Sequence, residues 1–199
     1  MLVAPSEVAE ILQCDENDAA MLRLLEAASR AINTYCGRTF EWRKDIVEYF
    51  DGDGQDVLWV SSPPITDAEG NITYSASSIT VWEDDDREFE DADKIDADDL
   101  RIDPIAGRID YAGIFSSGPR IIKVQYNGGY SLSTMPEDVK YACIALVSDW
   151  WLHRSYRQLD RLGGQGPLDW PNILPANTLP EKVLQLLQPY RRNIYSTGF

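Results

Sequence analysis

Alternating carboxylates give the sequence its sharpest candidate for metal chemistry. The run Asp51-Gly52-Asp53-Gly54-Gln55-Asp56 resembles the start of a calcium loop, in which carboxylates at alternate positions supply oxygen ligands. The sixth position is Asp56 instead of the glycine that the loop requires, and the twelfth is Ser62 instead of a bidentate glutamate. A tight turn between two strands explains the same residues. We therefore predict no metal site and keep a calcium-dependent binding module as the alternative.

His153 is the single histidine and so the first candidate for acid–base catalysis. It lies beside Arg154 late in an apolar segment, where an imidazole can instead stabilise the negative end of a helix dipole. Nucleophilic catalysis needs a residue on a shaped turn, and the sequence has no G-x-S-x-G or comparable motif. Gly163-Gly164-Gln165-Gly166 lacks the Lys-Ser/Thr pair of a phosphate-binding loop. We predict no catalytic residues, no cofactor and no enzymatic activity.

The charge of the chain is strongly acidic and unevenly distributed. The net charge is -15, and residues 83–99 alone contain 11 acidic and 2 basic residues, a local net of -9. Such a run is typical of a solvated loop, because like charges resist burial and extend the backbone. An acidic surface repels the DNA backbone, which argues against duplex binding but suits a channel through which DNA must slide. The plainer alternative is that the charge only keeps the protein soluble.

Length and composition favour a single compact domain. The 199 residues are 44% hydrophobic, enough for one sizeable core. Cys14, Cys36 and Cys143 are odd in number and far apart, so neither a disulfide framework nor a metal knuckle is indicated. No stretch approaches the roughly 20 apolar residues of a membrane-spanning helix. We expect a cytosolic protein with reduced thiols and no membrane partner.

Hydrophobic periodicity predicts an α+β fold that is mainly helical. Residues 6–13 and 18–36 are predicted to form N-terminal helices, and residues 136–156 a long central helix that is apolar almost all round and therefore buried. Between them, residues 45–126 hold short β-rich runs separated by turn residues, which predict a small antiparallel meander or barrel. We assign residues 1–157 to one core domain, in which these helices pack against the β region.

Residues 158–199 are predicted to be a flexible connector followed by a C-terminal helix. The connector is rich in proline and glycine, and the helix over 181–195 carries an apolar stripe that a partner's groove would cover. A helix that packs back on its own core is the alternative. The residues predicted to bind a partner are Val183, Leu184, Leu187, Tyr190, Arg191 and Arg192.

Three segments, in their order and spacing, resemble the head-tail connector family of long-tailed bacteriophages. The first is the helical pair EVAEILQCDENDAAMLRLLEAASRAINTYCGRTF. The second is VQYNGGY followed by MPEDVKYACIALVSDWWLHR, which is similar to the family's strand, Gly-Tyr turn and proline-started helix. The third is the ending PYRR. Between them, LWVSSPPIT and the stretch from SITVWEDDDREF to GRIDY are similar to the β region of the longer members.

The resemblance implies a structural virion protein that forms a ring, commonly of twelve copies, beneath the portal protein. Such a ring extends the DNA channel, lets double-stranded DNA pass without specific binding, and docks the next neck or tail-completion protein. The protein would then be found in the virion neck, and in the host cytoplasm during assembly. The C-terminal helix would be the portal-docking element. The acidic side chains expected at the channel or its rim are Asp84, Asp85, Asp86, Asp91 and Asp93.

Overall fold

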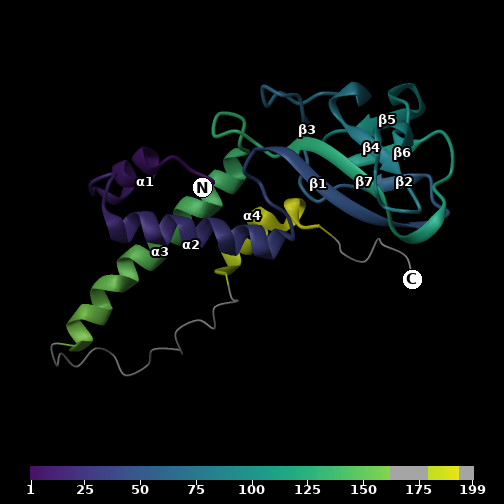
Figure 1. Ribbon diagram of the computed structural model, residues 1–199. Coiled ribbons are helices and arrows are strands. Elements are labelled where there is room, and N and C mark those ends of the chain that lie inside the picture. The colour runs from purple at the N-terminus through teal and green to yellow at the C-terminus, as the bar shows by residue number, and fades with distance from the viewer. Residues whose placement is uncertain (162–178, 193–199) are drawn as a thin grey trace. The chain divides into compact units, whose positions relative to one another are not determined.

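The computed structural model describes residues 1–161 and 179–192, with side chains described up to Leu152 in the first of these ranges. The chain divides into two compact units (Figure 1). Unit 1 comprises Met1–Arg38 and Thr134–Phe199, and unit 2 comprises Thr39–Ser133. One core domain over residues 1–157 stays a prediction, whereas the contacts of the chain give this division into two units. Its physical cause is that the β region closes a hydrophobic core of its own.

Helices form the described part of unit 1. Asp18 caps the second helix, because its Oδ1 accepts hydrogen bonds from the backbone N–H groups of Ala20 and Met21 at 2.8 and 3.0 Å. Gly37 ends the same helix with a φ of 64°, a left-handed conformation that glycine adopts without steric cost. The helices are α1 (Pro5–Leu12), α2 (Ala19–Cys36), α3 (Glu137–Arg161) and α4 (Glu181–Leu187), followed by the 3-10 helix η4 (Gln188–Tyr190).

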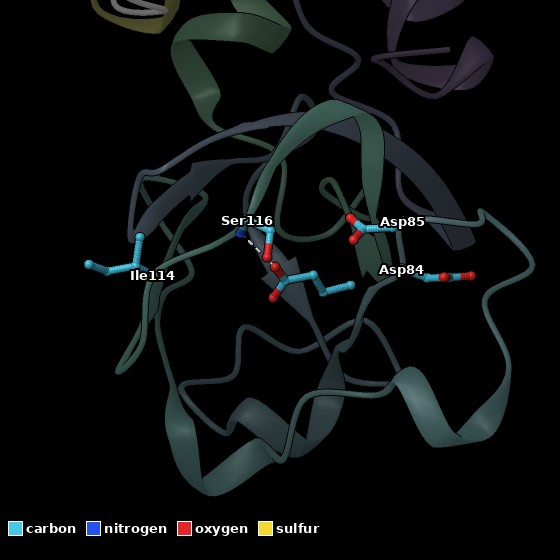
Figure 2. A pocket seen from close by; sticks show the side chains of 5 residues that line it. Asp84, Asp85, Ile114 and Ser116 are labelled. Carbon is cyan, nitrogen blue, oxygen red and sulfur yellow. Dashed lines mark hydrogen bonds between the residues drawn. The ribbon is translucent and has the colours of Figure 1, made fainter.

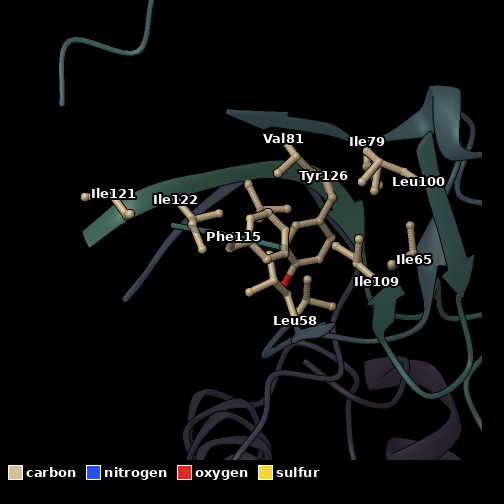
Figure 3. Close-up of a cluster of buried hydrophobic side chains, with 12 residues drawn as sticks. Leu58, Ile65, Ile79, Val81, Leu100, Ile109, Phe115, Ile121, Ile122 and Tyr126 are labelled. Atoms are coloured by element: carbon tan, nitrogen blue, oxygen red, sulfur yellow. The ribbon is translucent and has the colours of Figure 1, made fainter. Parts of the chain in front are cut away.

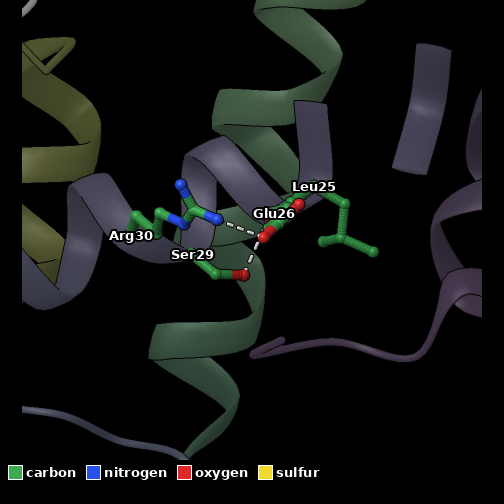
Figure 4. Close-up of polar contacts among 4 residues, drawn as sticks. All are labelled: Leu25, Glu26, Ser29 and Arg30. Carbon is green, nitrogen blue, oxygen red and sulfur yellow. Dashed lines mark hydrogen bonds and ion pairs between the residues drawn. The ribbon is translucent and has the colours of Figure 1, made fainter. Parts of the chain in front are cut away.

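The core of unit 1 lies where α2 packs against α3. Ser29 is buried in this core, and its Oγ donates to the carbonyl of Leu25 (Figure 4). The same Oγ lies 3.9 Å from Cys143 Sγ on α3. The fully buried side chains of the two helices are Met21, Leu25, Ala28, Ile32, Cys36, Val139, Ala142, Cys143, Leu146 and Val147. The expectation that the central helix is buried all round is wrong, because Tyr141 and Leu152 of α3 are each 64% exposed.

Two antiparallel sheets form unit 2. Strands β1 (Arg43–Asp53), β7 (Ser117–Gly128), β3 (Ile65–Thr66) and β4 (Thr80–Glu83) make the larger sheet, in which β7 pairs with the other three. Strands β2 (Val57–Trp59), β6 (Arg108–Tyr111) and β5 (Leu100–Asp103) make the smaller one. The 3-10 helices η1 (Ala76–Ser78), η2 (Asp91–Asp93) and η3 (Ala97–Asp99) lie between strands.

The core of unit 2 contains side chains from both sheets (Figure 3). Tyr126 of β7 lies among them and is almost completely buried. The other members of the cluster are Leu58, Val60, Ile65, Ile79, Val81, Leu100, Ile109, Phe115, Ile121, Ile122 and Val124. Alternation explains this packing, because Ile122, Val124 and Tyr126 fall at every second position of β7 and so share one face of the sheet.

The predicted α+β class is confirmed, but its helical emphasis is not, because unit 2 is built from seven strands in the described residues. The expected turn at Asp51–Asp56 does not close a hairpin. β1 pairs with β7, which lies some seventy residues later in the chain, whereas β2 belongs to the other sheet. None of the helices in residues 1–161 and 179–192 is long and apolar enough to cross a membrane.

Candidate functional site

Unit 2 carries nearly all of the chain's excess negative charge. Thr39–Ser133 contains 21 acidic and 8 basic residues, a net of -13 within a total of -15. The acidic run at residues 83–99 begins at the end of β4 and extends through η2 and η3. We therefore expect any function that depends on repulsion of a polyanion to reside in unit 2.

Most residues of the acidic run are exposed, as expected of a solvated loop, but the backbone is folded into turns rather than extended. Asp84 closes a turn in which its carboxylate accepts hydrogen bonds from the N–H groups of Asp86, Glu88 and Phe89, at 2.7 to 2.9 Å. These bonds, the one from Phe89 above all, hold the pKa of Asp84 below its usual range because they stabilise the charged carboxylate. Neighbouring negative charges can lie close together in this turn because backbone N–H groups stabilise one of them, the Asp84 carboxylate.

The later part of the run is held by similar local contacts. Glu90 and Asp93 form a capping box around η2, and Asp96 caps η3 by accepting from the N–H of Asp98. Lys94 donates to Asp91 at 2.7 Å, which lowers the pKa of that carboxyl. Of the five predicted channel residues, Asp85, Asp86 and Asp91 are therefore exposed, whereas Asp84 and Asp93 are partly buried and hold the loop together.

Phe89 anchors this loop on the outer face of the larger sheet. Lys123 of β7 lies directly opposite Tyr49 on β1 and Trp82 on β4. Its Nζ is 4.3 Å from the ring centroid of Trp82 and 5.5 Å from that of Phe89, and the Phe89 and Tyr49 rings are 5.6 Å apart. Cation–π contacts of this kind orient the lysine between aromatic rings. The cluster was not predicted from the sequence, although alternation along DIVEYF and SITVW could have placed Tyr49 and Trp82 on one face.

A shallow, open depression of about 380 Å³ lies beside the start of the acidic run (Figure 2). Its lining residues are Glu83, Asp84, Asp85, Ile114 and Ser116. Glu83 Oε1 accepts a hydrogen bond from the Ser116 N–H at 2.6 Å, so that carboxylate already has a partner. The lining combines carboxylates with an exposed isoleucine and contains no cation to bind an anionic substrate. The depression is thus an acidic feature of the surface of unit 2.

The candidate calcium turn serves the fold. Asp51 Oδ1 accepts a hydrogen bond from the Arg120 N–H at 2.8 Å, and the carbonyls of Gln55 and Asp56 accept from Phe115 and Tyr111. Residues 1–161 and 179–192 contain no group of three or more His, Cys, Asp or Glu side chains placed to hold a metal ion. The side chain of His153 lies outside the described residues.

The C-terminal helix α4 packs against α3 within unit 1. Val183 and Leu187, two members of the predicted docking stripe, are buried there, while Leu184 is partly buried. The Arg192 N–H donates to the carbonyl of Cys36 at 2.9 Å. This packing matches the alternative of a helix that packs back on its own core, and the docking role of the stripe stays a prediction.

Three further members of the predicted docking set lie at the end of this segment. Tyr190 and Arg192 are partly buried and Arg191 is exposed, with the Arg191 guanidinium 5.5 Å from the Tyr35 ring centroid. Burial raises the pKa of the nearby Cys36 thiol to about 11, although Arg38 and Arg191 oppose the shift. The connector predicted over residues 158–180 falls mostly outside the described residues.

Comparison with known proteins identifies relatives over nearly the whole chain. A family model described as Head completion protein matches residues 2–193. The chain is also similar in fold to a solved structure of the neck of an empty GTA particle computed with C6 symmetry, with a TM-score of 0.60 and 18% identity, covering 99% of this chain and 93% of that one. The neck of a native GTA particle computed with C12 symmetry gives a TM-score of 0.59 at 18% identity, covering 99% and 92%.

A third similar structure is the virion of a native gene transfer agent particle, with a TM-score of 0.53 and 19% identity, covering 92% of this chain and 81% of that one. No curated protein matches the sequence. At these identities the solved structures establish similarity of fold, whereas the family model establishes descent.

Proposed function

The chain belongs to the head completion protein family and is a structural head-tail connector, and from this premise we propose that it assembles as a ring in the particle neck. The observation that carries the proposal is the family match over residues 2–193. It is supported by the similar fold of chains from necks with six- and twelve-fold symmetry. The proposed role is structural rather than catalytic, with about twelve copies joining the capsid to the tail.

The proposed ring meets the portal protein on one side and the next neck or tail-completion protein on the other, after assembly in the host cytoplasm. The C-terminal segment supplies a portal contact through its rim rather than its buried stripe. The residues assigned to that rim are Arg191, which is exposed after η4, and Leu184, which is partly buried on α4. A cation at the edge of such a contact adds steering and orientation more than affinity.

Unit 2 is proposed to face the DNA that passes through the ring. Its net charge of -13 would repel the phosphate backbone and so keep the DNA from adhering to the wall. We assign the role at the channel or its rim to Asp85, Asp86 and Asp91, whose side chains are exposed. Asp84 and Asp93 contribute by holding the loop in shape.

Electron microscopy of the full-length protein mixed with its portal tests the ring. We expect a closed ring stacked coaxially on the portal, with the channel continuous through both. Portal particles that remain bare at saturating protein concentration would refute the proposal.

The channel role has a separate test on the assembled ring. A triple variant, Asp85→Asn, Asp86→Asn and Asp91→Asn, removes three exposed charges without touching the Asp84 turn. We expect increased, salt-sensitive retention of duplex DNA, because each charge removed weakens a repulsion that salt screens. The matched control neutralises Glu7, Glu10 and Glu16, which are exposed in unit 1. Equal DNA retention by both variants would show that the acidic run has no special place in the channel.

A further inference from the structure

The long strand β1 forms one margin of the larger sheet. It is eleven residues long and, among the described elements, makes its extensive contacts with β7 alone. Its pairing with β7 is regular from Ile46 to Phe50, between two irregularities. Within this regular part, Val47 and Tyr49 point to the outer face and are 42% and 44% exposed. An edge strand with exposed apolar side chains is a template for association.

The opposite margin of the same sheet also carries exposed apolar side chains. Beyond β3, the chain turns back through an Asp67 turn, and Ile72 forms an antiparallel bridge with Thr66. The Thr73 N–H donates to the carbonyl of Ile65 at 3.3 Å, which keeps the segment alongside β3. Ile72 and Tyr74 are 43% and 67% exposed, at the two-residue spacing of an extended strand.

The two margins differ, as a ring requires. A cyclic ring is built from heterologous contacts, in which one surface of a subunit meets a different surface of the next. A contact between two copies of the same margin would instead close a two-fold dimer.

The strand directions also match across such a contact. β1 and β3 are each antiparallel to β7, so they run in the same direction, and the segment at Ile72 is antiparallel to β3. The segment at Ile72 of one copy therefore runs opposite to β1 of a neighbour related by a one-twelfth turn. Such a turn is comparable in size to the usual twist of about 20–25° between adjacent strands.

Charge is complementary between the margins. Arg43 and Lys44 are exposed at the start of β1, whereas the turn beside the other margin carries Asp67 and the exposed Glu69. Hydrogen bonds from Asn71 lower the pKa of Asp67, so its carboxylate is charged at neutral pH. Trp42, which precedes Arg43, packs against Gly70 of this turn and donates to Thr66 Oγ1 at 3.0 Å, so these charges already lie near one another within one copy. The choice of a second copy as the occupant therefore rests on the two different margins and on the strand directions.

We propose that neighbouring copies meet through these margins, with Val47 and Tyr49 of one copy packing against Ile72 and Tyr74 of the next. This inference rests on the proposed ring and places the contact between neighbouring subunits in unit 2. The occupant is a second copy of this chain.

Cysteine cross-linking of the full-length protein assembled on portal tests the assignment. The background is Cys14→Ser, since Cys36 and Cys143 are buried. A double variant, Val47→Cys with Ile72→Cys, is treated with a short bifunctional maleimide. We expect a ladder of covalent multimers extending to the complete ring. Neither single variant should give any multimer, because each contact between neighbouring copies then holds only one thiol and the reagent needs two.

A second double variant, Val47→Cys with Ile114→Cys, is the control, because Ile114 is 70% exposed in the same unit but lies at the acidic depression. It should lose the ladder entirely. Rings seen by electron microscopy without a ladder from the first pair would overturn the inference and leave the proposed function standing. Dimers from Val47→Cys alone would overturn it in favour of a two-fold contact. Absence of rings from the unmodified protein would overturn the proposed function and the inference together.

Discussion

The hydroxyl of Tyr126 on β7 donates a hydrogen bond to Glu48 Oε1 on β1 at 2.5 Å. The same hydroxyl oxygen accepts from the Ser62 N–H at 3.1 Å, and the Ser61 N–H donates to the Glu48 carboxylate. Because Ser61 and Ser62 follow β2, this network ties the larger sheet to the chain that leaves the smaller one. These hydrogen bonds therefore connect the two sheets in addition to the hydrophobic core that they share.

Replacement Tyr126→Phe should lower the free energy of unfolding by about 1–3 kcal/mol, because it leaves the buried Ser62 N–H without its acceptor and removes one of the donors to Glu48, which keeps its bond from the Ser61 N–H. Urea denaturation followed by tryptophan fluorescence measures the change. Tyr74→Phe, at a position that is 67% exposed, is the control and should stay within about 0.5 kcal/mol of the parent. Equal stability of the two variants would contradict the role assigned to the network.

Alkaline pH should destabilise the protein through the same hydroxyl. Burial above all, and then the Glu48 charge, raise the pKa of Tyr126 well above its usual value. The folded state therefore holds this proton more tightly than the unfolded state, so the contribution is complete below about pH 10 and declines as pH rises further. Stability measured from pH 8 upward should fall less steeply in Tyr126→Phe than in the parent. Parallel curves for the two proteins would show that Tyr126 does not contribute.

The N-terminal helices could be predicted from the sequence because their signals are local. The pairing of strands that lie far apart in the chain could not be predicted. Asp18 and Gly37 act within their own turns, so the limits of α2 can be inferred from residue type. The pairing of β1 with β7 depends on residues some seventy positions apart, and the neighbouring β2 was the natural but wrong partner. The site was predicted only in part, because composition identified the acidic run but could not show that Phe89 fastens it to the sheet.

Replacement Asp84→Ala should release the acidic turn. It removes the acceptor for three backbone N–H groups, so amide hydrogen exchange at Asp86, Glu88 and Phe89 should accelerate. Asp86→Ala removes the same charge from an exposed position and is the control. In the parent, these three amides should stay protected from exchange at pH values above the usual aspartate pKa. Their protection should decline as pH falls through the lowered pKa of Asp84, because the protonated carboxyl is a weaker acceptor. Unchanged exchange in Asp84→Ala would mean that other contacts hold the turn.

The core of unit 1 should not tolerate a charge at Leu146. This side chain is fully buried on α3, so Leu146→Asp places an uncompensated carboxylate among apolar groups at a cost of several kcal/mol. Tyr141→Asp is the matched control, because it adds the same group to a 64% exposed position of the same helix. Thermal unfolding should separate them clearly. If Leu146→Asp melted like the parent, the packing of α3 on α2 would be in error.

The buried stripe of α4 gives the last prediction. Leu187 is fully buried in unit 1, so Leu187→Ala should lower the free energy of unfolding by about 2–5 kcal/mol through lost burial and the cavity left behind. Gln185→Ala, at an exposed position of the same helix, should leave stability nearly unchanged. Urea denaturation measures stability, and co-sedimentation with portal measures binding. If α4 packs within its own unit, Leu187→Ala should lower stability. Arg191→Glu should instead weaken portal binding without unfolding the protein. A Leu187→Ala protein of parental stability that no longer bound portal would instead assign the stripe to the portal, since the same side chain cannot fill both grooves at once.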